Sequence, residues 1–217
     1  MQNHLSKALV FLVGLLLGTI TLVVVARIDL GSPRPISFHE HANVGVYLNG
    51  KKLDLSANKY MYVVPCFIDG EVPPGESSSN PIEKIHLHNN NGETVHVHHK
   101  GLTYADFFEG INMKLQASQF IDDQGNEYAS NNTHTLDFYL NGQKITDLAG
   151  HEVRDLDKAL ITYGPKTRSS ESINEELLSV PDDACISSGT CEHRGQAPAE
   201  NCGSHETKSW VESLLGY

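Results

Sequence analysis

The sequence predicts an α+β protein, in which an N-terminal transmembrane helix precedes a mixed β-sheet domain with one packed helix. Three observations carry this prediction. An uncharged hydrophobic segment lies near the N-terminus, two later segments place Asn-Gly between alternating apolar residues, and one segment has the cap and apolar spacing of a short helix. A chain of 217 residues is long enough for one domain with appendages.

The hydrophobic segment, residues 8–26, contains no charged residue. As a helix it would be about 28 Å long, close to the roughly 30 Å hydrocarbon core of a membrane. We expect a cytoplasmic N-terminus at 1–7, a transmembrane signal anchor at 8–26 and a linker at 27–35. Positive residues nearly balance across the segment and specify its orientation only weakly. We place the N-terminus inside because the polar bulk of the chain follows the anchor, and this bulk is then outside the cytoplasm. A cleaved signal peptide is the alternative, because residues 24–26 resemble a small-residue cleavage site.

The domain predicted at 36–165 contains two hairpins with Asn-Gly turns. Residues 42–48 and 136–140 both alternate apolar and polar positions, and each is followed by Asn-Gly and a second β-prone run. Asn-Gly favours a type I′ turn, because both central residues of that turn have positive φ. We therefore expect two hairpins, joined by further elements.

Between these hairpins we expect a strand at 60–64, a His-rich hairpin at 84–99 and a helix at 103–111. Thr103 is a suitable N-cap for this helix, and Phe107, Phe108 and Ile111 share one face. A last strand is expected at 159–163. Hairpins, one helix and a final strand are consistent with a mixed sheet of β-grasp-like type, with one buried face and one solvent-exposed face.

The residues of the His-rich hairpin alternate between imidazole and aliphatic side chains. A turn at 90–92 would place His86 opposite His96, and His88 opposite Thr94. The aliphatic residues then lie on the opposite face, toward the core. We therefore predict that these histidines lie on the solvent-exposed face.

His39 and His41 have the same two-residue spacing at the start of the first strand. If that strand adjoins the hairpin, six imidazoles gather on one surface, where opposed Cβ atoms are about 5 Å apart. Such a surface suits copper, zinc or nickel, with copper favoured by affinity and zinc by abundance, and Glu40 and Glu93 could add oxygen ligands. Incidental surface histidines and a proton sensor are the alternatives. The predicted metal ligands are His39, His41, His86, His88, His96 and His98. We predict no ligand role for His99, His134 or His151.

The formal net charge of −11 argues against nucleic acid as a partner, since no basic cluster is present to neutralise phosphates. The sequence also lacks a Gly-x-Ser-x-Gly nucleophile motif and a His-Glu-x-x-His zinc motif. We assign no catalytic residue, and the sequence favours binding over catalysis.

The segment 166–217 is polar, so we expect it to be partly disordered or pinned by disulfides. Cys185 and Cys191 can close a short loop, and Cys202 can then pair with Cys66. A second metal site that uses Cys185, Cys191, His193 and Cys202 is the alternative. Residues 210–217 have the pattern of a short amphipathic helix, which would dock on the sheet or on a partner.

The stretches "HEHAN", "YLNG", "HLHNNNGETVHVHHKGLTYADFF" and "DLDKALITYG" resemble an uncharacterised family of membrane-anchored, His-rich extracytoplasmic domains of archaeal and candidate-phylum bacterial type. Some members are labelled disulfide isomerases, but this chain lacks Cys-x-x-Cys. The resemblance covers about residues 36–164 and implies architecture and placement at the cell membrane. The sequence thus predicts a membrane-anchored copper- or zinc-binding protein. The alternative is a structural or interaction subunit of an envelope assembly, with an envelope protein as partner.

Overall fold

The computed structural model describes residues 7, 13–19, 38–62 and 81–197 of the chain. The chain divides into two compact units, residues 1–36 with 205–217, and residues 37–204. In the first unit, residues 13–19 are helical. Within the described ranges, no helix is both long and apolar enough to cross a bilayer. The predicted linker, Cys66, Cys202, the helix at 210–217 and most of the predicted anchor lie outside the described residues.

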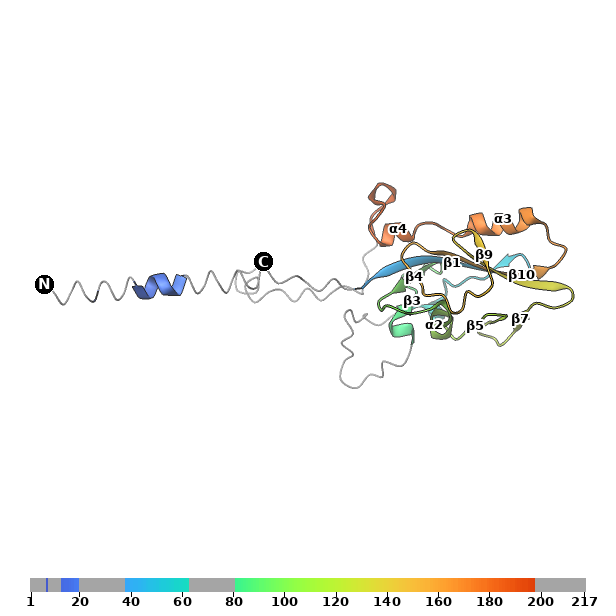
Figure 1. The fold of residues 1–217 in the computed structure, drawn as a ribbon, viewed down its shortest axis with the longest axis horizontal. Coiled ribbons are helices and arrows are strands. Elements are labelled where there is room, and N and C mark those ends of the chain that lie inside the picture. The colour runs from blue at the N-terminus through green and yellow to red at the C-terminus, as the bar shows by residue number, and fades with distance from the viewer. Residues whose placement is uncertain (1–6, 8–12, 20–37, 63–80, 198–217) are drawn as a thin grey trace. The chain divides into compact units, whose positions relative to one another are not determined.

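The second unit is built on a seven-stranded sheet of order β3-β4-β1-β10-β8-β9, in which β2 also pairs with β1 (Figure 1). The first and last strands, β1 and β10, are parallel, and the other pairs are antiparallel. The strands are β1 (Glu40–Leu48), β2 (Lys51–Lys52), β3 (Ile85–His86), β4 (Thr94–Val97), β8 (His134–Leu140), β9 (Gln143–Ile145) and β10 (Lys158–Pro165).

Both predicted Asn-Gly hairpins are present. Asn49 and Gly50 have φ values of 55° and 75°, and Asn141 and Gly142 have φ values of 52° and 78°. These left-handed conformations are those that a type I′ turn requires. The alternation of apolar residues on β1 is also confirmed, because Ala42, Val44 and Val46 all point into the hydrophobic core.

One face of the sheet packs against α2 (Tyr104–Gly110), as predicted. The side chains of Thr103 and Asp106 form a capping box at the start of this helix. A three-stranded sheet follows. Its residue Phe120 packs against Phe108 of α2, with ring centroids 5.3 Å apart. Its strands are β5 (Lys114–Gln116), β6 (Gln119–Ile121) and β7 (Glu127–Ala129), and the 3-10 turns η1 (Asn58–Tyr60) and η2 (Pro81–Glu83) lie earlier in the chain. Sequence analysis missed this small sheet, because strands of three residues are too short to show a periodic pattern.

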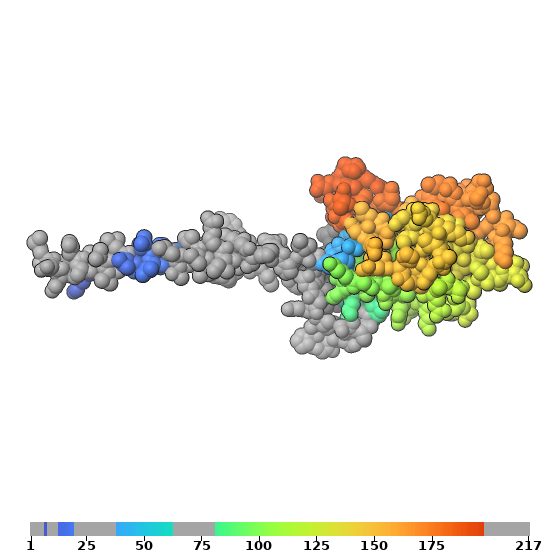
Figure 2. Space-filling model, viewed as in Figure 1, coloured from blue at the N-terminus to red at the C-terminus, as the bar shows by residue number. Residues whose placement is uncertain are grey.

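The opposite face is covered by α3 (Ser170–Ser179) and α4 (Ala184–Ser187), which lie across the sheet from α2 in Figure 1. Residues 170–197, coloured orange to red, pack along the upper side of the domain in Figure 2. The short turn η3 (Glu192–Arg194) follows α4. Val180 is buried against Gly45 of β1, and Glu176 accepts a hydrogen bond from Thr162 of β10 at 2.5 Å. The prediction of one solvent-exposed face is therefore wrong in this part of the sheet.

The mixed α+β class is confirmed, and the β-grasp likeness stays a prediction. In the expected strand at 60–64, Met61 forms an isolated bridge with Leu87, while residues 63 and 64 lie outside the described residues. The bridge between Cys185 and Cys191 is present, as the sequence suggested. It excludes the alternative metal site that used these two thiols.

Candidate metal centre

The predicted histidines come together on three adjacent strands and on the residues next to the ends of those strands. β4 pairs with β3 on one side and with β1 on the other, so that His96 lies between His86 and His41 in the register. The predicted opposition of His86 and His96 is confirmed, as is the neighbouring position of the first strand. The neighbouring residues Val95 and Ala42 pair with each other and lie in the hydrophobic core. Because adjacent residues of a strand point to opposite faces, the histidine side chains point away from this apolar layer.

The turn of the His-rich hairpin differs from the prediction. Asn89 and Asn90 occupy the left-handed region, with φ values of 54° and 57°, and Asn91 donates its backbone N–H to the His88 carbonyl at 2.8 Å. Gly92 has a different role, because a Cβ atom there would lie 2.5 Å from the backbone of Leu55. Three consecutive asparagines allow the turn to form at Asn89 and Asn90, nearer the N-terminus than predicted, since Asn tolerates the left-handed region well.

The histidines are buried, and their predicted solvent exposure is wrong. His86 is 0% exposed and His88, the most exposed of the five buried members, is 5% exposed. Only His39 is half-buried among the six. The ring of Tyr62 stacks on His86 with centroids 4.6 Å apart, and Ser188, at the end of α4, contacts His41. The prediction failed because the polar segment after residue 166 gave no sign that it would pack over this face.

The six imidazoles form two groups, each able to hold a metal ion. The first trio is His39, His41 and His96, and the second trio is His86, His88 and His98. Within each trio the ligand nitrogens lie within 4.8 Å of one another. Nitrogens on one tetrahedral zinc ion are roughly 3.4 Å apart, since each bond is about 2.0–2.1 Å long. Small side-chain rotations would therefore close either trio around an ion.

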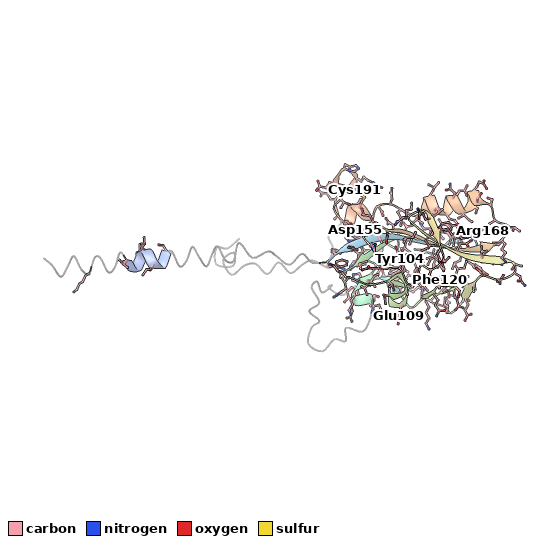
Figure 3. All side chains as sticks on the ribbon, viewed as in Figure 1. Tyr104, Glu109, Phe120, Asp155, Arg168 and Cys191 are labelled. Atoms are coloured by element: carbon pink, nitrogen blue, oxygen red, sulfur yellow. A yellow bond between two sulfur atoms is a disulfide. The ribbon has the colours of Figure 1, made fainter. Side chains whose placement is uncertain are left out.

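The first trio has a hydrogen-bonded support that fixes one of its rings. Ser188 Oγ donates to Asp155 Oδ1 at 2.5 Å, so it must accept the hydrogen bond that joins it to His41 Nδ1 at 2.9 Å. His41 therefore carries its proton on Nδ1 and presents Nε2 as the ligand nitrogen. Asp155 also accepts a hydrogen bond from the His41 backbone N–H at 3.1 Å. In Figure 3, Asp155 lies at the same end of the domain as Cys191. Supports of this kind orient metal-binding histidines and raise their basicity.

The second trio has a matching support at His86. Its Nδ1 lies 2.5 Å from the Ile82 carbonyl oxygen, which can only accept a hydrogen bond, so Nδ1 carries the proton and Nε2 is the ligand nitrogen. Burial lowers the pKa of His86 well below its usual value, and the nearby His98 and His88 lower it further. His86 is therefore neutral near pH 7, which is the form that binds a metal.

The remaining sequence-predicted groups lie elsewhere. Glu40 accepts a hydrogen bond from the Asp155 backbone N–H, and Glu93 forms an ion pair with Lys52, so neither belongs to a trio. His134 stacks on Tyr163 with ring centroids 5.1 Å apart, outside both trios. His99 and His151 also lie outside them.

Sequence reasoning missed Asp155, Ser188 and Tyr62 as neighbours of the histidines. Ser188 lies 147 positions from His41 along the chain, and no local pattern could indicate a contact at that separation. Leu156, which follows Asp155, has a φ of 65°, a rare conformation for a bulky side chain. Its backbone N–H donates to the His41 carbonyl at 2.7 Å, so this strained turn helps to hold Asp155 beside the first trio.

Comparisons with protein-family models, with curated proteins and with solved structures gave no match for this chain. The resemblance to a His-rich membrane-anchored family therefore stays a prediction. The site consists of two groups of three histidines, mostly buried, with a hydrogen-bonded support in each.

Proposed function

We propose that this chain is a membrane-anchored, extracytoplasmic protein that binds copper or zinc ions through its six clustered histidines. The observation that carries the proposal is the convergence of the six rings into two trios, from three paired strands and the residues next to their ends. Imidazole is a common ligand of copper and zinc, and one ion can be bound by all three rings of a trio.

The nature of the ligands favours a transition metal over calcium or magnesium. Both trios offer nitrogen alone, whereas calcium and magnesium are held by oxygen atoms. Copper is favoured by its intrinsic affinity for imidazole, and zinc fits equally well because it has no geometric preference from its d electrons.

The proposed location rests on the sequence and on one covalent bond. The uncharged segment 8–26 matches the thickness of a membrane. The disulfide between Cys185 and Cys191 supports placement outside the cytoplasm, because such bonds persist in oxidising compartments.

Metal titration of the full chain tests the proposed function. Zn(II) and Cu(II) are titrated in competition with a chromophoric chelator, for the wild type and for the double variant His86→Gln with His96→Gln, which loses one ligand from each trio. We expect submicromolar, stoichiometric uptake by the wild type and at least a hundredfold weaker binding by the variant. Substitution of His134 and His151, the matched control pair outside the trios, leaves binding unchanged. No stoichiometric uptake would overturn the proposal and would favour the structural or interaction role.

A further inference from the structure

We infer that the two trios form one dinuclear metal centre, whose two ions share a small anion that is not part of the protein. This inference rests on the proposed metal binding and extends it, because it names a second ligand and couples the two ions. The contact between the trios, the charge of the centre and the number of ligands all support a shared anion.

The two trios are in direct contact. The ring centroids of His39 and His98, which belong to different trios, are 4.5 Å apart, and those of His88 and His96 are 4.8 Å apart. Neighbouring rings inside the trios have the same spacing, 4.3 Å for His39 and His41 and 4.9 Å for His86 and His98. Ions held by the two trios would therefore be neighbours.

The histidine ligands cannot balance the charge of two divalent ions. All six ligands are imidazoles, which are neutral when they bind a metal. Two such ions would bring four positive charges into a group of mostly buried side chains, and uncompensated buried charge is strongly unfavourable. Among the described residues, Asp155 is linked to the first trio by hydrogen bonds, because it reaches the His41 ring through Ser188.

The ligand count leaves a position for an anion on each ion. Zinc sites with three histidines complete a tetrahedron with water, hydroxide or another small ligand. Where two ions lie roughly 3.5–4 Å apart, one oxygen can bind both. A shared hydroxide would lower the total charge and fill the open position of both ions. Azide, a small anion that also bridges copper ions, is the probe for this position.

Copper titration of the full chain, followed by electron paramagnetic resonance, tests the inference. We expect two Cu(II) ions per chain, with an integrated signal well below two spins per chain, because a bridging ligand couples the two unpaired electrons. Azide added to the fully loaded protein should give a new charge-transfer absorption at one azide per two copper ions.

Single-trio variants complete the experiment. His41→Gln with His96→Gln, and separately His88→Gln with His98→Gln, should each leave one bound Cu(II) that contributes one full spin. His151→Gln serves as the matched control and should keep two coupled ions. The wild-type spin count is independent of the variants, so the test holds even if a variant fails to fold.

The outcomes separate this inference from the proposed function. One bound ion per chain, or two ions with two full spins, would overturn the dinuclear centre and leave metal binding intact. No stoichiometric copper uptake would overturn both. Loss of signal that persists in a folded single-trio variant would also contradict coupling between the trios.

Discussion

Ser188 acts on the proposed metal centre through another residue, since its hydroxyl links the carboxylate of Asp155 to the ring of His41. The link selects the Nδ1-protonated form of His41 and restricts rotation of the ring. Removing a hydrogen-bonded support of a ligand typically weakens metal binding by about 10–100-fold. Ser188 is therefore a positioning residue whose contribution can be measured separately from that of the ligands.

We expect Ser188→Ala to weaken Zn(II) binding at the first trio by at least about tenfold. The measurement is a chelator competition in a His88→Gln and His98→Gln background, where only the first trio keeps all its ligands. Ser188→Thr keeps the hydroxyl and should restore the affinity. Ser56→Ala, which removes a hydroxyl that contacts Asp54 on the surface, is the control. Equal affinity of Ser188→Ala and its background would refute the role given to this hydroxyl.

At the scale of the element, the segment from α3 to α4 packs on the face of β1 that carries His41. β1 presents His41, Asn43 and Gly45 to this segment. Asn43 donates a hydrogen bond to Asp183 at 2.7 Å and accepts one from the Ala184 backbone N–H at 2.9 Å. Gly45 permits the close approach of Val180, because a Cβ atom on Gly45 would lie 2.7 Å from Val180 Cγ2.

Gly45→Ala should lower the free energy of unfolding by about 1–3 kcal/mol, because the new methyl group overpacks against a β-branched side chain that cannot rotate away easily. Val180→Ala makes room for it, so the double variant should be more stable than the sum of the two single effects by about 0.5 kcal/mol or more. Urea denaturation measures all four proteins. Leu178→Ala on α3, where the side chain is 73% exposed, is the control and should combine additively with Gly45→Ala. Additivity with Val180→Ala would contradict the contact.

At the scale of the whole molecule, a charged network joins the start of the C-terminal segment to strands β8 and β10. Arg168 is 3.0 Å from the Asp137 carboxylate on β8 and donates to Thr162 on β10 at 2.5 Å. It lies at the opposite end of the domain from Asp155 in Figure 3. Burial raises the pKa of Asp137, but the hydrogen bonds and positive charge of Lys144, the hydroxyl of Thr135 and the charge of Arg168 outweigh this effect. The pKa of Asp137 is therefore lower than its ordinary value of 3.8.

This lowered pKa predicts a specific loss of stability in acid. Below its ordinary pKa of 3.8, Asp137 is protonated in the unfolded chain but still ionised in the folded chain. The unfolded state then binds more protons, so the free energy of unfolding falls as the pH falls through the folded pKa. Urea denaturation from about pH 5 down to about pH 3 should show a weaker pH dependence in Asp137→Asn than in the wild type. Glu109→Gln, on the exposed side of α2, is the control; equal slopes for wild type and Asp137→Asn would refute the prediction.

The sequence by itself determined the local features of this protein. Asn-Gly fixed both hairpin turns, because these residues accept positive φ, and Thr103 with Asp106 fixed the start of α2. The alternation of imidazole and aliphatic residues also determined that His86 and His96 would oppose each other on the face away from the core, since strand side chains alternate with period two.

Only the tertiary structure decided what covers the histidines and how they group. On β1, Gly45 is covered by Val180, Asn43 by Asp183 and His41 by Ser188, which lie more than 130 residues after the strand and pack through long-range contacts that leave no periodic signal. The division into two trios likewise depends on three strands meeting side by side. Local conformational preferences are encoded within a few neighbouring residues, whereas the partner of a polar face is determined by packing across the whole chain.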